Sequence, residues 1–229
     1  MSEGRPIGQY ITELVVVFVG VALAFAVENL REDLNEREVG EEYLEGFAQD
    51  LRLDLAMLEQ EQSSRQIQLA NGHLLLELID EPDASPAAFF GAYYGSLGAR
   101  AIAPNRNTMD EVLNSGNLRL IRNSDVRAAL LELYASYEKI TFLEAHIARD
   151  FENYLYDPTF STVRLNLTGP WPDNAENRLA MDTLRNNLII QNGLRLLVGN
   201  VAYPGTGLLA MLEDAQSQVV ALLQSLSEE

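Results

Sequence analysis

Cysteine is absent from this chain of 229 residues, and histidine occurs only twice. Without cysteine there are no disulfides, no thiol catalysis, no thiolate metal sites and no covalently attached haem. A zinc site would then need mostly carboxylates, which is uncommon, and neither histidine completes the Glu-x-x-His pattern of di-iron bundles. The short motifs of zinc proteases, phosphate-binding loops and serine hydrolases are missing as well. We therefore expect no metal, no cofactor and no enzymatic activity.

Positive charge is also scarce. Sixteen Lys and Arg residues stand against 34 Asp and Glu residues, which gives a formal net charge of −18. Nucleic-acid binding requires a basic surface, and anionic lipid surfaces attract Lys and Arg, so both kinds of binding are disfavoured. An acidic surface would instead attract a basic protein partner, although it also serves simply to keep a protein soluble.

One long uncharged run stands out near the N-terminus. Residues 14–27 carry no charge, and Glu28 ends the run. Fourteen residues are too few for a membrane span, but the apolar pattern extends upstream to Ile7, and about 20 residues are sufficient. Glu13 lies close to one end, where a carboxylate costs less than at the bilayer centre. We predict a tail over residues 1–6, a transmembrane helix over 7–27 and an acidic extramembrane domain over 28–229.

Two other interpretations of this run were weighed. A cleaved signal peptide would fit the small-x-small sites at residues 22–26, but its basic region would consist of Arg5 alone. A buried core helix would suit the length of the run, but not its position directly before a charged helix. Orientation in the membrane is a near tie, since Arg5 lies on one side and Arg31 and Arg37 lie on the other.

The predicted span has a face suited to helix packing. Gly20 and Ala24 are four residues apart, and small residues at this spacing let another helix approach closely. Glu13 would need an interfacial position, a proton or a partner. We therefore name Gly20, Ala24 and Glu13 as the candidate contacts with other membrane subunits.

The rest of the sequence is typical of helices throughout. From Leu30, alternating spacings of four and three lead through ten positions, Leu30, Leu34, Arg37, Glu41, Leu44, Ala48, Leu51, Leu55, Leu58 and Gln62. Seven of the ten are apolar, and the polar positions Arg37 and Glu41 lie near the span. A bundle helix is therefore expected to continue the span, with bends expected at Gly40 and Gly46. Strand-like alternation is nowhere sustained. Helices near 30–74, 123–157, 176–200 and 206–227 are expected to form the body, with shorter helices over 86–97 and 107–114. Gly116 is expected to end the helix over 107–114, Asn123 or Ser124 to cap the next helix, and Asp157-Pro158 to end it. The last helix has apolar residues in four-three spacing at Leu208, Leu212, Ala215, Val219, Leu222 and Leu226. The predicted fold is all-α, with one N-terminal transmembrane helix followed by an elongated antiparallel bundle.

Acidic residues cluster on the first of these helices. Glu28, Glu32, Asp33 and Glu36 form one group, and Asp50 and Asp54 form another. Such groups are usually solvated helix faces, and loose calcium binding or a basic partner is the alternative. In the helix over 123–157 a single polar residue, Glu144, interrupts a seam that is otherwise apolar from Val126 to Tyr154.

Aromatic residues gather in two places. The short helix predicted over 86–97 and the irregular Pro-rich stretch near residue 171 contain the candidate partner contacts Phe89, Phe90, Tyr93, Tyr94 and Trp171. Tyrosine and tryptophan are enriched in interface cores. Packing against the bundle is the alternative interpretation.

Three segments carry a family likeness. They are residues 13–24, the pair Tyr43-Leu44 followed by Asp50-Leu51 and Asp54, and residues 115–123, which read Ser-Gly-Asn-Leu-Arg-Leu-Ile-Arg-Asn. Over residues 7–155 the chain resembles a widespread, uncharacterised family of bacterial membrane-anchored helical proteins. That resemblance implies an N-terminal anchor in the inner membrane and a periplasmic domain, but no activity. The chain departs from the family in its short, nearly uncharged tail.

Together these features predict a non-catalytic accessory or structural subunit of a larger bacterial membrane complex. Its partners would be the lipid bilayer, other integral membrane subunits and a basic protein, with no nucleic acid. Photosynthetic and respiratory complexes are the host classes considered. The alternative is a free-standing membrane-anchored sensor or signalling protein, which would need a ligand pocket in the bundle.

Overall fold

The computed structural model describes residues 7–98, 101–164 and 169–228, with side chains from Glu13 onward. Within these ranges the chain is helical and contains no strand, which confirms the all-α prediction. The predicted tail over residues 1–6 lies outside the described residues.

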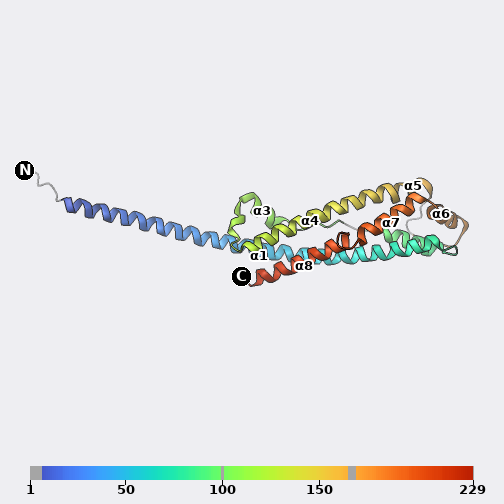
Figure 1. Ribbon diagram of the computed structural model, residues 1–229, viewed down its shortest axis with the longest axis horizontal. Helices are drawn as coiled ribbons and strands as arrows, with labels where there is room; N and C mark the ends of the chain where they lie inside the picture. Colours follow the sequence, from blue (N-terminus) through green and yellow to red (C-terminus); the bar gives the residue numbers. More distant parts are fainter. Residues whose placement is uncertain (1–6, 99–100, 165–168, 229) are drawn as a thin grey trace, which may run out of the picture.

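The first helix, α1, dominates the molecule. It spans Ile7–Asp80, a single element of 74 residues. Its first half extends alone, and its second half forms one side of the body (Figure 1). Residues 13–35 are exposed, and the first buried position is Gly40. We call residues 28–39, between the predicted span and the body, the stalk.

No break occurs at the two glycines where a bend was expected. α1 is continuous through both, and each allows a close approach instead. A Cβ atom on Gly40 would lie 2.7 Å from the carbonyl oxygen of Leu120, and one on Gly46 would lie 2.8 Å from Oγ1 of Thr108. Their small size therefore serves packing against the neighbouring segment.

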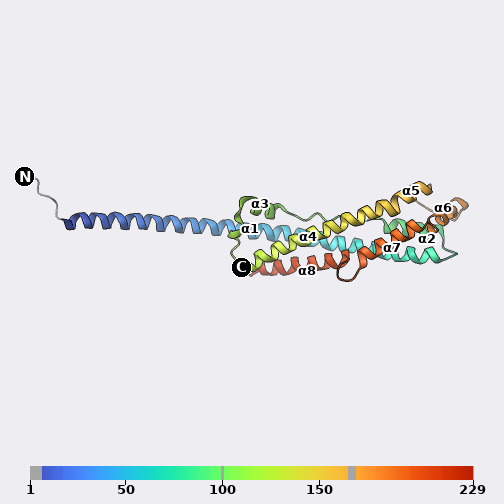
Figure 2. The same ribbon diagram turned by 45° about the horizontal axis from the view of Figure 1, so that its top comes forward.

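In the part of the chain that the structure describes, nine shorter elements complete the body. They are α2 (Pro86–Ser96), α3 (Asn107–Ser115), the 3-10 turn η1 (Asn117–Leu120), α4 (Ser124–Phe151), the π-helical turn η2 (Glu152–Tyr156), α5 (Asp157–Thr162), α6 (Ala175–Arg185), α7 (Leu188–Ala202) and α8 (Leu208–Ser227). The long helices α1, α4, α7 and α8 lie side by side in both views (Figures 1 and 2).

The directions of these helices differ from a simple antiparallel order. Residue numbers rise together along α1 and α4, because Asp54 interacts with Tyr137 and Arg65 bonds to Glu144. The pair α7 and α8 runs back toward the end of the body from which the first half of α1 extends (Figure 1). The segment between α2 and α3, which is irregular where it is described, over residues 97–98 and 101–106, makes the parallel arrangement possible because it connects the end of α2 with α3. We call it the crossing segment.

Helix ends follow the predicted signals in part. Gly116 ends α3 in the left-handed conformation at φ 72°, and the Asn123 side chain caps α4 by accepting from the backbone N–H groups of Asp125 and Val126. The helix predicted over 176–200 is two helices, because Asn187 caps a new helix, α7.

Proline at position 158 does not end the helical path as expected. The π-helical turn η2 follows α4 directly, and α5 then begins at Asp157, so that Pro158 occupies the first turn of a new helix. A proline is tolerated there because its missing N–H has no intrahelical acceptor.

The buried faces show where periodicity succeeded and where it failed. The last helix, α8, buries Leu208, Leu212, Ala215, Val219 and Leu222 in the predicted four-three spacing. On α1 the predicted residues Leu51 and Leu58 are buried, but Leu44, Ala48, Leu55 and Gln62 are only half-buried. The buried stripe lies beside them and includes polar side chains, which form the site described next.

Candidate functional site

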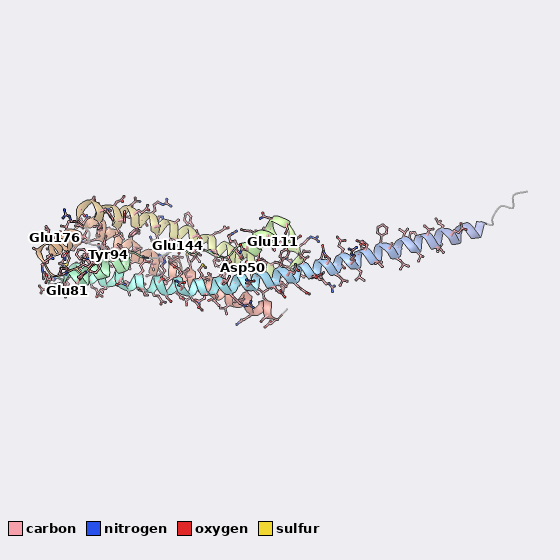
Figure 3. All side chains as sticks on the ribbon, turned by 180° about the vertical axis from the view of Figure 1, so that it is seen from behind. Asp50, Glu81, Tyr94, Glu111, Glu144 and Glu176 are labelled. Atoms are coloured by element: carbon pink, nitrogen blue, oxygen red, sulfur yellow. The ribbon has the colours of Figure 1, made fainter. Side chains whose placement is uncertain are left out.

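Five polar side chains line the buried face of α1, and one more faces them from α4. Each is at most 7% exposed: Asp50, Asp54, Glu61, Arg65, Gln68 and Glu144. The prediction that Asp50 and Asp54 form a solvated acidic face is therefore wrong. Figure 3 shows Asp50 near the end of the body that faces the anchor and Glu144 further along.

Arg65 is the centre of the larger group. Its Nε atom donates to Oε1 of Glu61 at 2.6 Å, and its Nη2 atom donates to Oε1 of Glu144 at 3.1 Å. Its Nη1 atom donates to Oε1 of Gln68, and Gln68 in turn donates to the carbonyl oxygen of Ser96 at 3.0 Å. One guanidinium thus links α1, α4 and the end of α2.

These side chains also hold the crossing segment. Where an irregular segment packs against helices, its backbone N–H groups need acceptors. Four N–H groups at and beyond the end of this segment donate to side chains of α1 and α4: Ile102 to Glu144 at 2.9 Å, Ala103 to the sulfur of Met57 at 3.2 Å, Asn105 to Asp54 at 2.8 Å, and Thr108 to Asp50 at 3.1 Å. The buried carboxylates therefore replace the strand or helix partners that this segment lacks.

Two tyrosines of α4, Tyr134 and Tyr137, lie beside Asp54 and the crossing segment and form a second polar group with them. The Tyr134 hydroxyl donates to the carbonyl oxygen of Asn105 at 2.9 Å, and the guanidinium of Arg106 lies 5.5 Å from the centre of the Tyr134 ring. The Tyr137 hydroxyl interacts with the Asp54 carboxylate, but neither it nor Oδ2 of Asp54 has a hydrogen bond of ordinary geometry.

Burial controls the ionisation of these groups. It raises the pKa of Asp54, against the opposing effect of the two hydrogen bonds from Asn105. It also raises the pKa of Glu144, which the Ile102 N–H and the Arg65 charge oppose. The pKa of Tyr137 rises because of burial and, secondarily, the nearby Asp54 charge. The two carboxylates serve as hydrogen-bond acceptors for backbone and guanidinium groups, which is a structural role.

The predicted membrane face lies on the isolated part of α1. Glu13 is exposed, and no heavy atom lies within 4 Å of the place where a Cβ on Gly20 would sit. Among the described residues, α1 is the one helix long and apolar enough to cross a membrane by length and composition. Packing of Gly20, Ala24 and Glu13 against another membrane helix stays a prediction.

The predicted aromatic contacts come together at the far end of the body. Phe89, Phe90 and Tyr93 are each at most 4% exposed, so these three side chains pack within the bundle. Tyr94 and Trp171 are half-buried, and their rings stack with centres 5.3 Å apart. Tyr94 appears at this end in Figure 3. Partner contacts through Tyr94 and Trp171 stay a prediction.

An open hollow lies elsewhere, between α4 and α8. It has a volume of about 800 Å³ and is lined by Ile140, Phe142, Leu143, Met211 and other residues of these helices and of the turn at Gly205. Phe142 is 76% exposed at its edge. We call it the α4–α8 groove.

Periodicity missed the buried polar group because the apolar residues chosen for the seam of α1 lie one position beside it. One signal was present. Glu144 was the single polar residue in the predicted seam of α4, and a carboxylate at a buried position requires a partner. The partner, Arg65, lies 79 positions away, too far for helical spacing to identify.

Within the described ranges, no group of three or more His, Cys, Asp or Glu residues is arranged to hold a metal ion. Comparison with known proteins finds no match to a family model, to a curated protein sequence or to a solved structure. The resemblance to bacterial membrane-anchored helical proteins therefore stays a prediction.

Proposed function

We propose that this protein is a non-catalytic accessory subunit of a larger bacterial membrane complex, in which it acts as a rigid strut. One observation carries the proposal. The candidate span and the buried face of the body belong to the same unbroken 74-residue helix. A continuous helix fixes both the height of the body above the membrane and its rotation about the α1 axis.

The side chains inside the body support a structural role. The buried acids bind backbone N–H groups or Arg65, and so they hold the crossing segment in place. Such partnered networks stabilise one arrangement of a core. A body built this way presents a fixed surface, which suits the assembly of other subunits.

Location follows from the same proposal. We place the span in the bacterial inner membrane and the acidic domain in the periplasm. The domain beyond residue 27 contains 15 basic and 32 acidic residues, and this charge would favour a basic partner protein. Photosynthetic and respiratory complexes are the classes of host that we propose.

Purification of the native complex tests the proposal directly. The tagged full-length chain would be extracted from its own membranes in mild detergent and its mass measured on a native gel. We expect migration in a complex several times larger than 25.5 kDa. Migration as a free monomer, with the tag shown to be accessible and the chain intact, would contradict an accessory-subunit role.

A second candidate function is a membrane-anchored sensor. The α4–α8 groove favours it, because ligand sites are concave and largely apolar. A sensor would carry a small molecule in this groove. Native mass spectrometry of the full-length chain should then detect a bound species that is lost in Met211→Trp, which would fill the groove, and retained in the exposed control Val220→Trp.

A further inference from the structure

An exposed apolar stripe continues from the predicted span onto the stalk. Leu30 and Leu34 are 60% and 56% exposed, and both lie beyond Val27, the last residue of the predicted span. Followed toward the N-terminus, spacings of three and four lead to Val27, Leu23, Gly20 and Val16. One face of α1 is thus apolar from inside the span to Leu34, with the heptad spacing typical of a coiled coil.

The body of the protein does not cover this stripe. The body face of α1 includes Gly40, Tyr43 and Phe47, and the same spacing leads back to Glu36. Glu36 is the last stalk position that the body reaches, through an ion pair of 2.7 Å with Arg119 of η1. Further back the body face would pass through Asp33 and Asn29, neither of which is apolar.

Lipid does not cover the outer end of the stripe, at Leu34, either. Seven residues separate Leu34 from Val27, so Leu34 lies about 10 Å beyond the end of the span at 1.5 Å per residue. The polar headgroup layer is only about 5–7 Å deep on each side of the hydrocarbon core. Leu34 is therefore in water unless another chain packs on it.

A second copy of this chain is a poor partner for the stripe. The two seam positions after Leu34 are Arg37 and Glu41, and in a symmetric parallel pair each would face its own copy. Asp33 would also lie opposite Glu38 of the copy, at the positions where coiled coils place complementary charges. Residues 28–42 hold seven acidic side chains and two arginines. The charges beside the stripe therefore fit a basic helix.

We propose that the stalk docks a parallel helix of another membrane-anchored protein, with apolar residues in heptad spacing and Lys or Arg beside them. The partner helix must be anchored because the stripe begins inside the membrane. This inference rests on the proposed function, which it deepens by stating the partner's chemistry. The span part of the partner packs on the Gly20 side of α1, and its stalk part covers Leu30 and Leu34.

A reconstituted system tests the chemistry. Because the chain has no cysteine, Leu34→Cys creates a single thiol. The full-length variant would be mixed in phosphatidylcholine vesicles with a synthetic transmembrane peptide that has leucine at the matching heptad positions, lysine beside them and one cysteine. The controls are a peptide with glutamate in place of lysine, and Glu32→Cys, about 200° around α1 from Leu34.

We expect about five times more disulfide between Leu34→Cys and the lysine peptide than with either control. Equal disulfide yields with the lysine and glutamate peptides would show that charge does not select the partner. Equal disulfide yields at positions 34 and 32 would show that the stripe is not the docking face. If most of the Leu34→Cys disulfide joins two copies of this chain, the partner is a second copy and the proposal is wrong.

Native membranes separate this inference from the proposed function. The variant Leu30→Ser with Leu34→Ser would be compared with Glu32→Ser and Asn35→Ser on native gels, after circular dichroism has shown equal helix content. We expect the leucine variant alone to leave the complex. If both variants stay in the complex, the stalk inference fails and the accessory role stands. If the wild type is a free monomer but the lysine peptide is captured, the accessory role fails and the docking face stands.

Discussion

Arg65 of α1 donates a hydrogen bond to Glu144 of α4 over 3.1 Å, and so joins residues 79 positions apart. Glu61 binds the same guanidinium at 2.6 Å, so two buried carboxylates share one buried positive charge. Glu144 also accepts the backbone N–H of Ile102. This arrangement connects α1, the helix that contains the candidate span, with α4 and with the crossing segment.

Removal of the Arg65 charge should therefore destabilise the body strongly. In Arg65→Met, Glu61 and Glu144 remain buried without a positive partner, a defect that typically costs about 3–5 kcal/mol. The free energy of unfolding would be measured by urea titration of the full-length chain in detergent, followed by circular dichroism. Arg119→Gln, which removes an exposed ion pair with Glu36, is the control and should cause only a small change.

A compensating variant distinguishes charge from packing. Glu61→Gln and Glu144→Gln, added to Arg65→Met, remove the two unpaired charges but keep oxygen atoms that can accept hydrogen bonds. We expect the triple variant to be more stable than Arg65→Met alone. If it is equally unstable or worse, the loss comes from the missing arginine side-chain packing, and the charge explanation is wrong.

Asp54 should make the stability of the fold depend on pH. Burial raises its pKa in the folded state above that in the unfolded chain. Its stabilising contribution is therefore complete below the unfolded pKa, near pH 4, and is lost as the pH rises through the folded pKa. Asp54→Asn cannot titrate, yet its side-chain oxygen can still accept from Asn105. The free energy of unfolding of the wild type, relative to this variant, should fall as the pH rises from about 4 through the raised pKa of Asp54 in the folded state.

Asp83→Asn, at an exposed turn position, controls for the loss of one negative charge from an acidic protein. Urea titrations at several pH values would be run on all three proteins. A wild-type stability that rises with pH relative to Asp54→Asn would show that Asp54 is stabilised as a carboxylate, and so would contradict the dominance of burial.

Gly40 of α1 should tolerate no side chain, in contrast to Gly91 of α2. A Cβ there would lie 2.7 Å from the backbone oxygen of Leu120, which cannot move aside as a flexible side chain could. Gly40→Ala should lower the free energy of unfolding by about 1–3 kcal/mol. Gly91 of α2 has no atom within 4 Å of its Cβ position, and Gly91→Ala should raise stability by up to about 1 kcal/mol. Thermal unfolding would compare the two, and a stabilising Gly40→Ala would refute the close packing of α1 on η1.

The sequence allowed local features of this fold to be predicted well. The spacing of Leu208 to Leu222, the left-handed Gly116 and the Asn123 cap depend on residues a few positions apart, and all three were identified. Helical periodicity and capping are local effects, so a single sequence is sufficient for them.

Features that depend on distant contacts were not predictable in the same way. Asp50 and Asp54 have the composition of a solvated face and are buried because the crossing segment needs acceptors for its N–H groups. The parallel direction of α1 and α4 depends on the return path of the same segment. Neither fact follows from the residues near Asp54 in the sequence. Both follow from which segment packs on α1.

The fluorescence of Trp171, the single tryptophan, reports on the packing of the aromatic residues at the far end of the body. Trp171 stacks on Tyr94 and lies 6.1 Å from the Phe90 ring, measured between ring centres. Tyr94→Ala should expose one face of the indole, shift its fluorescence to longer wavelength and lower stability by at least about 0.5–1.5 kcal/mol. Tyr203→Ala, at a 65% exposed position, is the control and should leave the emission unchanged. An unchanged spectrum in Tyr94→Ala would show that Trp171 does not pack on α2 in solution.

The continuity of α1 can be tested by insertions in the stalk. Two alanines placed between Leu34 and Asn35 would turn the body by about 200° relative to the span and raise it by only about 3 Å. Seven alanines would raise it by about 10 Å but return it to within about 20° of its original direction. Both insertions leave the Glu36 pair with Arg119 on the body side intact.

A rigid strut should respond differently to these two changes. If partners bind both the span and the body, the two-residue insertion should abolish comigration with the native complex, because the body then faces the wrong way. The seven-residue insertion keeps the direction and should retain more of the complex if rotation matters more than height. Equal retention with both insertions would show that the stalk acts as a flexible tether. In that case α1 would not fix the rotation of the body. The contacts that hold the protein in the complex would then lie either on the span or on the body, but not on both.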